Sequence, residues 1–310
     1  MIVTVTMNPT IDKTVDVGHL KRGGLNRVRH VESDAGGKGI NVSKTIRELG
    51  GESVATGFIG GKNGEFIRQV LETSGIKTDF VEVGQETRTN MKVFEDTGEV
   101  TEINEQGPNI SPDQLAQLLE KLEGYAQKDT LFVLAGSIPA GVPKDIYKTI
   151  IEKVHEKGAK VLLDADGEMF VNALKAGPDM IKPNREELQE YAEMDYLASE
   201  QELLGIARKL MEQGISTVAV SMGKSGAMFL EKDYQVKCPG LQVKAHSTVG
   251  AGDAMVAALS YAWDQGLDRE EMVKTCMATS AGAVTTLGTK PPSRALVDEL
   301  MAQVEIEKID

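Results

Sequence analysis

Residues 247–254, STVGAGDA, combine small residues with one carboxylate directly before a long apolar stretch. The apolar stretch predicts a helix that begins among Gly250, Ala251 and Gly252, whose side chains carry almost no bulk. The exposed N–H groups of a helix N-terminus stabilise an anion. Asp253 would stand in the first turn, where its carboxylate can take a hydroxyl proton while the N–H groups hold charge on a phosphate. The alternative is that Asp253 only complements the helix dipole above a tight glycine turn.

A second glycine-rich segment, DAGGKGINVS at residues 34–43, precedes another predicted helix. Gly37 and its neighbouring glycines allow the backbone to approach a ligand closely. Lys38 supplies a compact positive charge and Asn41 supplies both a donor and an acceptor, which is the mixture that a polyhydroxy compound needs. The spacing is neither GxGxxG nor that of a P-loop. The alternative is a flexible turn before a helix.

Charged residues in the first third of the chain form a candidate binding set. Asp12, after the first predicted strand, could accept hydrogen bonds from two neighbouring hydroxyls, or it could cap a turn. Arg88 and Lys92 lie four apart on one predicted strand and therefore share a face. Together with Arg27 they could receive a phosphate group, although solvated surface charge explains the spacing equally well.

Two segments in the second half follow predicted strands and have the composition of a nucleotide site: KPNREE at 182–187 and SMGKSG at 221–226. A nucleotide on a parallel sheet lies beyond the carboxyl ends of such strands. Asn184 and Glu187 lie three apart at a helix start, where they could orient a hydrated Mg²⁺ or where Asn184 could cap the helix. A P-loop is excluded, because Val218 stands where its first glycine would be.

The composition narrows the class of protein. The chain has 310 residues, 41% of them hydrophobic, and a formal charge of −13, which disfavours nucleic-acid binding. Two cysteines and four scattered histidines predict neither a disulfide framework nor a zinc site. We see no signal peptide and no apolar run long enough to span a membrane, so we expect a cytoplasmic protein without a membrane partner.

The elements that must position these residues change in character near residue 110. Before it we expect strands at 1–8, 26–32, 53–60, 79–83, 90–95 and 99–103, with helices at 40–49 and 63–74. After it, helices at 111–127, 143–157, 184–193, 199–213, 251–265, 269–286 and 293–304 alternate with strands at 130–136, 161–166, 179–182 and 216–223, and a hairpin spans 227–238.

This alternation predicts an α/β fold with three layers and a mainly parallel central sheet. The strands of the first third do not fit that sheet well. We therefore expect one domain over residues 1–310, with a small β-sheet lid built from segments at about 10–34 and 79–106. A dehydrogenase of the Rossmann type is the α/β alternative, but the segment after the first strand lacks GxGxxG. A non-catalytic sugar-phosphate-binding regulator would be expected to lack Asp253 or Lys38.

Taken together, the motifs at 8–12, 36–41, 182–187, 221–226 and 247–254 resemble the ribokinase/PfkB family of sugar kinases over about residues 1–300. The sequences of the N-terminal motifs are similar to those of the branch of this family that acts on ketohexose phosphates. The resemblance implies a ribokinase-like fold and an ATP- and Mg²⁺-dependent sugar-phosphate kinase. Its expected acceptor is fructose 1-phosphate, ahead of tagatose 6-phosphate and fructose 6-phosphate. It also makes a homodimer through the lid plausible.

The resemblance implies a role for each matching residue. Asp253 would be the base, and Gly250, Ala251 and Gly252 would form the anion hole. The sugar hydroxyls would be held by Asp12, Gly37, Lys38, Gly39 and Asn41, the sugar's phosphate by Arg27, Arg88 and Lys92, and the border of the sugar by Glu102 and Ser137. The nucleotide would be held by Lys182, Asn184, Ser221, Met222, Gly223, Lys224, Ser225, Gly226, Thr248 and Gly282, and Mg²⁺ by Glu187. The GTKPPS segment at 288–293 has no role in this scheme.

Overall fold

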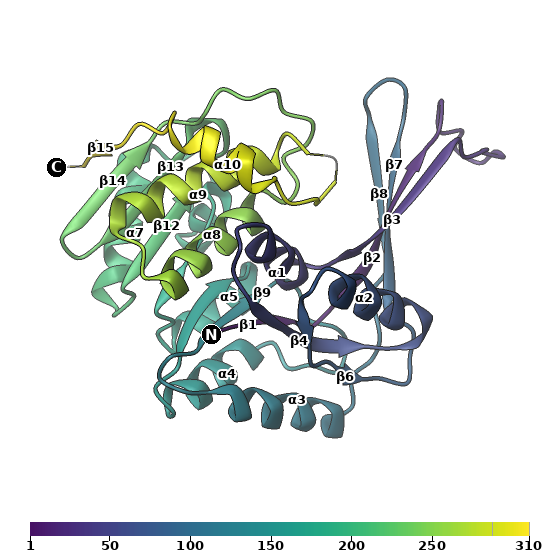
Figure 1. Cartoon of the computed structure of the whole chain (residues 1–310), viewed down its shortest axis with the longest axis horizontal. Coiled ribbons are helices and arrows are strands. Elements are labelled where there is room, and N and C mark those ends of the chain that lie inside the picture. Colours follow the sequence, from purple (N-terminus) through teal and green to yellow (C-terminus); the bar gives the residue numbers. More distant parts are fainter. Residues whose placement is uncertain (287, 310) are drawn as a thin grey trace.

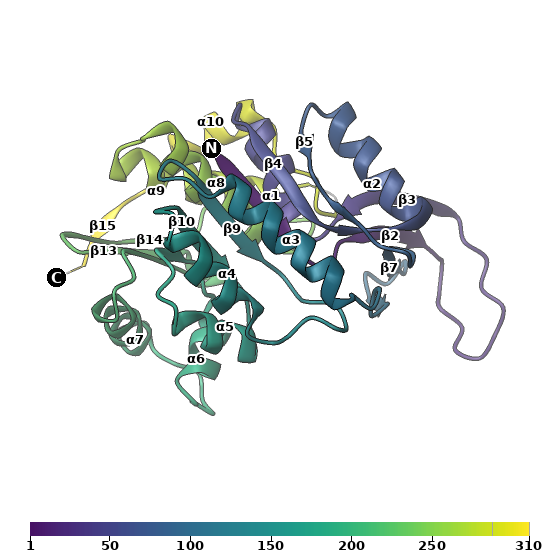
Figure 2. The ribbon, with the colours of Figure 1, turned by 90° about the horizontal axis from the view of Figure 1, so that it is seen from below.

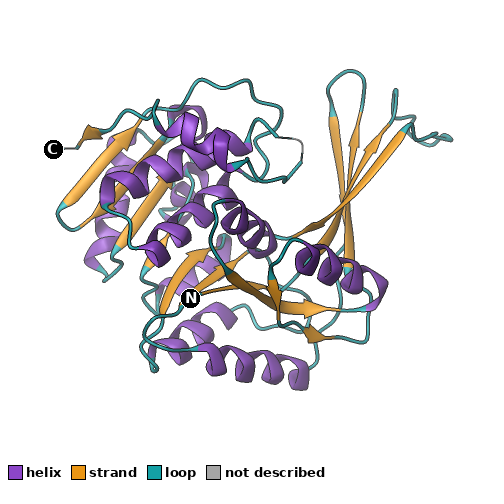
Figure 3. Ribbon diagram, in the orientation of Figure 1, coloured by secondary structure: helices purple, strands orange, loops and turns teal. Residues whose placement is uncertain are grey.

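The computed structural model describes residues 1–286 and 288–309. In this part of the chain the larger of two sheets is mainly parallel and lies between two layers of helices (Figures 1 and 3). Its strands run in the order β15 (Glu307–Lys308), β14 (Tyr234–Cys238), β13 (Ala227–Glu231), β12 (Thr217–Ser221), β11 (Met180–Ile181), β10 (Lys160–Asp164), β9 (Leu131–Ala135), β1 (Ile2–Thr6), β4 (Ser53–Ile59) and β5 (Lys77–Thr78), with β6 (Val81–Glu82) also paired to β4.

The strands from β12 to β5 are parallel, and β13 to β15 extend the sheet antiparallel. The central strands β1 and β9 are buried on both faces, as expected of strands covered by helices on either side. The register places Leu134 of β9 opposite both Val5 and Leu163, so the strands end at one common edge. Polar residues that follow neighbouring strands are therefore gathered at that edge.

Helices cover both faces of this sheet, which confirms the three-layer prediction (Figure 2). One face is covered by α3 (Pro112–Tyr125), α4 (Ile146–His155), α5 (Gly167–Leu174), α6 (Arg185–Tyr191) and α7 (Glu200–Glu212), and the other by α1 (Lys38–Glu48), α8 (Ala251–Gln265), α9 (Arg269–Ala283) and α10 (Arg294–Met301), with α2 (Gly61–Thr73) beside α1. Among the residues described, no helix is both long enough and apolar enough to cross a membrane.

Side-chain N-caps mark several of the helix starts. Ser111 accepts a hydrogen bond from the Gln114 N–H in a capping box, and Ser199 does the same for Glu202. Helix α5 was not predicted, because its eight residues are too few to show a clear helical period. Helix α9 ends at Ala283, earlier than the predicted residue 286.

The second sheet has four strands in the order β3 (His30–Gly36), β2 (Thr10–Asp16), β7 (Arg88–Phe94) and β8 (Val100–Asn104). Figure 1 shows this small sheet projecting away from the helices and the large sheet. The strand expected at 26–32 is wrong in its bounds: it begins at His30, because the Asn26 side chain closes a turn with the backbone of Lys21. The segment from residue 79 contributes β6 to the large sheet before it enters the small one.

The base of the small sheet is anchored to the rest of the molecule by a separate apolar cluster. Ile11 of β2 and Ala35 of β3 pack with Ile40 of α1 and with Ile67 and Leu71 of α2. Burial of a side chain of this size contributes roughly 1.5–3 kcal/mol. The base of the sheet is therefore fixed, while strand β8 at its edge is exposed along its whole length.

Candidate active site

Two cavities meet at the common edge of the large sheet. The larger, of about 880 Å³, lies beyond β10, β11 and β12, and is lined by Asp164, Lys182 and Ser221 at the ends of these strands. The smaller, of about 350 Å³, lies between this edge and the small sheet. Lys38 and Asp253 line both cavities. The molecule therefore holds two ligand spaces that share one cation and one carboxylate.

Helix α8 begins at this junction. Its N-cap is Gly250 with φ 87°, a left-handed conformation that favours glycine, and Thr289 would lie 3.6 Å from a β-carbon at this position. The first N–H groups of an α-helix have no partner within the helix. That of Ala251 makes only a long hydrogen bond of 3.4 Å to the Thr248 carbonyl, and that of Gly252 is available to an anion. Gly250 lines the small cavity, whereas Ala251 and Gly252 line the large one. The predicted anion hole thus lies between the two ligand spaces.

Asp253 is buried in the first turn of α8, with only 9% of its surface exposed. The Asn41 side chain donates a hydrogen bond of 2.8 Å to its Oδ2 atom. Burial and the nearby charge of Asp164 raise the pKa of Asp253 to about 6, although Asn41 and the lysines Lys38 and Lys182 act in the opposite direction. A carboxylate with this pKa is ionised at neutral pH and is still a useful proton acceptor.

Two lysines flank a buried carboxylate beside Asp253. The Nζ atom of Lys38 lies 3.2 Å from Asp164 Oδ2, and that of Lys182 lies 3.3 Å from Asp164 Oδ1. The two lysines lower the pKa of Asp164 despite its burial, so this carboxylate stays ionised. A β-carbon on Gly252 would lie 3.5 Å from the Lys182 ammonium, which places that ammonium against the anion hole. The junction is therefore rich in groups that can bind phosphate oxygens.

Most of the residues predicted to hold the sugar line the small cavity: Asp12, Gly37, Lys38, Asn41, Arg88, Lys92, Glu102 and Ser137. The Asp12 carboxylate lies directly over Gly36, where a β-carbon would be 2.3 Å from Oδ2, so only glycine fits there. Burial raises the pKa of Asp12, which neighbouring cations oppose. Lys92 is 14% exposed and its ammonium lies 4.0 Å from the Glu102 carboxylate.

Arg88 lines the small cavity and also has a structural role. Its guanidinium donates hydrogen bonds of 3.0 and 3.2 Å to the Asn8 carbonyl and of 3.2 Å to the Glu105 carbonyl. It therefore ties the end of the small sheet to the segment after β1. A guanidinium carries five N–H donors, so two remain for a ligand in the cavity.

Two of the predicted sugar ligands lie elsewhere in the described structure. Gly39 packs against β1, where a β-carbon would be 2.5 Å from Thr6 Oγ1, and it is not among the cavity-lining residues that the structure describes. Arg27 is exposed on the loop of residues 17–29 and lines neither of the two cavities.

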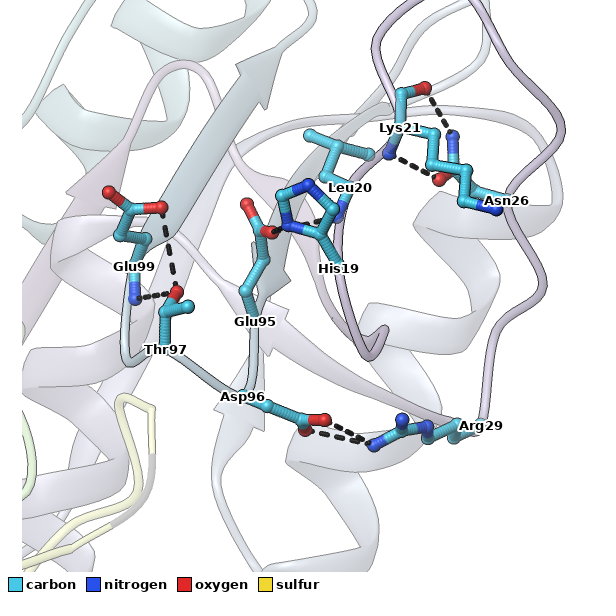
Figure 4. Close-up of polar contacts among 9 residues, drawn as sticks. All are labelled: His19, Leu20, Lys21, Asn26, Arg29, Glu95, Asp96, Thr97 and Glu99. Atoms are coloured by element: carbon cyan, nitrogen blue, oxygen red, sulfur yellow. Dashed lines mark hydrogen bonds and ion pairs between the residues drawn. The ribbon is translucent and has the colours of Figure 1, made fainter.

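This loop is nevertheless ordered by polar contacts at its two ends (Figure 4). His19 and the N–H of Leu20 both contact the Glu95 carboxylate at 2.7 Å. Arg29 donates two hydrogen bonds, of 2.8 and 2.9 Å, to Asp96. Arg27 lies between these two sets of contacts and is exposed.

The large cavity gathers most of the residues predicted for the nucleotide: Lys182, Asn184, Ser221, Met222, Gly223, Lys224, Gly226 and Thr248. Ser225 and Gly282 are not among its described lining residues. Gly282 instead faces Pro292, 2.7 Å from where its β-carbon would be, so it allows α9 to pack against the segment after residue 288. Neighbours of Gly282 on α9, Ser280 and Ala281, line the cavity in its place.

Glu187 lines the large cavity and also completes a capping box at α6. Its Oε2 accepts a hydrogen bond of 2.8 Å from the Asn184 N–H, and Asn184 Oδ1 accepts one of 2.8 Å from the Glu187 N–H. The capping alternative is therefore confirmed for Asn184, and both residues line the large cavity. Orientation of a hydrated Mg²⁺ by this pair stays a prediction. Among the described residues there is no group of three or more acidic, histidine or cysteine side chains that could hold a metal alone.

Several cavity residues were missed by the sequence analysis. Asp164 has a recognisable signal, since it ends a buried strand in VLLDAD at the edge where ligands bind. The small cavity is also lined by Thr6, Asn8, Thr10, Asn90, Asn104, Asp166 and Thr289. Thr289 gives a role to the GTKPPS segment, which closes over Gly250.

The two cavities meet at Asp253, so a phosphoryl donor in one and an acceptor in the other can reach the same carboxylate. This is the arrangement of a small-molecule phosphotransferase.

Comparison with known proteins agrees with this class. The model of the pfkB family of carbohydrate kinases matches residues 5–296, and the chain belongs to this family. The 1-phosphofructokinase of Bacillus subtilis is 36% identical to it, with 100% of each chain covered. The D-tagatose-1-phosphate kinase of Bacillus licheniformis is 32% identical, with 99% of each chain covered.

The solved structures agree as well. Phosphofructokinase-2 from Escherichia coli in complex with potassium has a TM-score of 0.92 and 28% identity, and the match covers 97% of this chain and 98% of that one. The ribokinase-like fold and the family expected from the motifs are therefore confirmed. The chain is a carbohydrate kinase that acts through transfer of a phosphoryl group.

Proposed function

We propose that this kinase transfers the γ-phosphoryl group of ATP to the C6 hydroxyl of fructose 1-phosphate, giving fructose 1,6-bisphosphate and ADP. The observation that carries the proposal is the position of Asp253, buried at the junction of the two cavities and beside the N-terminus of α8. The 1-phosphofructokinase named above, which matches the full length of this chain, supports the same acceptor.

The large cavity suits ATP. Lys182 and the N–H groups at the start of α8 would hold the phosphates, and Ser280 and Ala281 of α9 would border the base. Gly223 follows β12 and lines the cavity, and a β-carbon added there would meet nothing within 4 Å. A cytoplasmic location, where ATP is abundant, belongs to the same proposal.

The residues present fit the Mg²⁺ that accompanies ATP in most kinases. This ion binds chiefly to phosphate oxygens and keeps several waters, so one or two carboxylates suffice. Glu187 lines the large cavity, and its Oε1 atom is the oxygen not used by the bond from Asn184. Burial raises the pKa of Glu187, and the nearby Lys182 opposes this shift. The ion would neutralise charge on the phosphates.

The small cavity suits a ketohexose with a phosphate far from the reacting hydroxyl. Asp12, Asn90 and Asn104 offer hydrogen bonds to sugar hydroxyls. Lys92, with Arg88, supplies positive charge on the strand β7 of the small sheet. A phosphate at C1 would lie there while the C6 hydroxyl reaches Asp253. The small sheet would act as a lid that carries the cations.

The chemical step is an in-line displacement. An oxygen lone pair of the C6 hydroxyl forms a bond to the γ-phosphorus, and the bond between that phosphorus and the β,γ-bridging oxygen breaks, leaving its electron pair on ADP. Asp253 takes the hydroxyl proton. The N–H groups at the start of α8 bind the oxygens of the transferring group, so positioning and electrostatics supply most of the acceleration.

A second candidate acceptor is tagatose 1-phosphate, because one full-length relative is named for it. It carries its phosphate at C1 like fructose 1-phosphate. The earlier alternatives, tagatose 6-phosphate and fructose 6-phosphate, carry it at the opposite end. They therefore serve as controls for which end of the sugar the small sheet holds.

The testing experiment is a coupled assay of ADP release with MgATP and five acceptors, namely the four sugar phosphates and free fructose. We expect fructose 1-phosphate to have the highest kcat/KM. Dominance of either 6-phosphate would reverse the proposed orientation of the sugar. Activity on free fructose alone would exclude the phosphate site.

We also propose that the protein is a homodimer through the small sheet. Val31 is 45% exposed and Ile103 is 57% exposed, and both lie on the face opposite to Lys92 and Glu102. The apolar tip residue Leu25 is 76% exposed on the adjacent loop. Sedimentation should give a dimer for the natural chain and a monomer for Ile103→Glu. A monomeric natural chain at micromolar concentration would contradict this proposal.

A further inference from the structure

Lys38 has surroundings that its implied role as a sugar ligand does not explain. It is the cation that lines both cavities, and the carboxylate shared with it is Asp253. A group that passes from the donor to the acceptor must cross the place where these two side chains lie. A ligand of the sugar hydroxyls alone would need to line only the small cavity.

The side chain of Lys38 is also built to reach a ligand. It is 34% exposed, whereas Lys182 on the other side of Asp164 is 4% exposed. Gly136, with φ 89°, leaves room for its stem, because a β-carbon there would lie 3.4 Å from Lys38 Cβ. Its ammonium lies 3.2 Å from Asp164, so the carboxylate holds it at the boundary before any ligand arrives.

Other residues already offer what the sugar hydroxyls need. Hydroxyls are both donors and acceptors, and Asp12 and the side-chain amides of Asn90 and Asn104 supply both kinds of partner. An ammonium group has three donors and no acceptor, and its full charge matches a phosphoryl group better than a hydroxyl. Because the Lys38 side chain is still 34% exposed beside Asp164, its remaining N–H donors at the boundary can reach an anionic ligand atom.

We propose that Lys38 contacts the γ-phosphoryl group while it is transferred, and that Asp164 positions it for this contact. The inference deepens the proposed function, on which it rests. As the bond to the leaving oxygen breaks, negative charge is spread over the three other oxygens of the phosphoryl group. The Lys38 ammonium donates to one of these oxygens and stays protonated throughout. The proton of the acceptor hydroxyl still goes to Asp253, and the electron pair still goes to ADP.

The test compares Lys38→Met and Lys38→Arg with the natural chain in kcat, KM and direct sugar-phosphate binding without nucleotide. We expect Lys38→Met to lower kcat about 10²-fold, as the loss of one donor to a transition state does. The dissociation constant of fructose 1-phosphate should stay within about twofold, and Lys38→Arg should recover part of the rate. A tenfold weaker binding of fructose 1-phosphate, with kcat preserved, would overturn the inference.

Lys148 provides a matched control. Its side chain is 37% exposed and lies 3.3 Å from Glu152, close to the exposure and ion-pair distance of Lys38. Because it is on α4, away from both cavities, Lys148→Met should leave kcat unchanged. An equal loss in this variant would show that any lysine removed in this way harms the enzyme, and would overturn the assignment.

Asp164→Asn tests the positioning role. We expect about a tenfold loss of kcat with little change in fructose 1-phosphate binding. We also expect the acid limb of the pH profile to move to lower pH, because the charge of Asp164 raises the pKa of Asp253. Lys38→Met should move that limb the other way, since Lys38 lowers the same pKa. A limb that stays in place in both variants would show that these two charges do not act at Asp253, and that result would overturn the positioning role.

Failure of the inference is separable from failure of the proposed function. If the natural chain used none of the ketohexose phosphates, the proposed acceptor would be wrong. Hydrolysis of MgATP without a sugar would still report on Lys38, because the same phosphoryl group is then transferred to water. A loss of about 10²-fold in Lys38→Met is expected there too, and an unchanged rate of hydrolysis would overturn the inference.

Discussion

The junction at the start of α8 and the small sheet differ in how the protein holds its charges. At the junction Asp253 and Asp164 are 9% and 2% exposed, and each contacts fixed partners on other elements. On the small sheet, strand β8 is exposed throughout, and the Arg29–Asp96 pair is 61% and 62% exposed. Buried charges act strongly because water does not screen them. The difference suggests that the junction carries the chemistry and the small sheet carries substrate recognition.

The largest effect is expected from replacing Asp253, the proposed proton acceptor at the junction. Asp253→Asn keeps the shape of the side chain and removes the proton acceptor, so kcat should fall by at least about 10²-fold with little change in binding of either substrate. Steady-state kinetics and direct binding measure both parts. Turnover close to that of the natural chain would show that another group is the base.

The next effect should fall on recognition alone. Lys92→Met removes a cation that lines the small cavity and should raise the KM for fructose 1-phosphate about tenfold, with the KM for ATP nearly unchanged. Lys148→Met is the control here too, because Lys148 is on α4 and lines neither cavity. Equal changes in both variants would show that the effect is not specific to the small cavity.

A pH profile sharpens the comparison without any substitution. Asp253 acts as a base only when ionised, and its pKa is about 6. Below that value kcat/KM should fall about tenfold for each unit of pH, as the fraction of ionised base falls. The sugar phosphate also ionises in this range, so its pKa must be measured separately. If the enzyme turns over free fructose, a pH profile with that substrate avoids this ionisation. A value of kcat/KM that does not change between about pH 5 and about pH 7 would contradict the assigned base.

The smallest effect is expected at the loop of the small sheet. Arg29→Ala removes one partner of an exposed ion pair and should change the free energy of unfolding by less than about 1 kcal/mol. Denaturant unfolding measures this change. A loss of several kcal/mol would mean that the loop is as firmly integrated as the junction, and the contrast between the two regions would fail.

The sequence predicts the junction well because its signals are local. Glycines followed by an apolar stretch specify the start of α8, and the capping residues specify α3, α6 and α7. Asp164 was missed because its importance depends on Lys38 and Lys182, which reach it from different elements. The place of Asp164 at the end of a buried strand is a signal for the residue itself, but its contacts with the two lysines leave no trace in the spacing of residues along the chain.

The small sheet was harder to predict for a related reason. Strand β2 was not recognised as a separate strand, and the segment at 26–29 was taken for a strand although side-chain bonds hold it as part of a loop. The position of Arg27 depends on how that loop folds back on Glu95 and Asp96. Patterns of alternation describe the strands, but side chains far apart in sequence set the path between them.

The most direct test of this division of roles is to measure kcat and KM for Asp253→Asn and Lys92→Met side by side. The account predicts that Asp253→Asn loses kcat and keeps its KM for fructose 1-phosphate. It predicts that Lys92→Met keeps kcat and loses affinity for the sugar phosphate. A loss of kcat by the same factor in both variants would contradict the separation of chemistry from recognition.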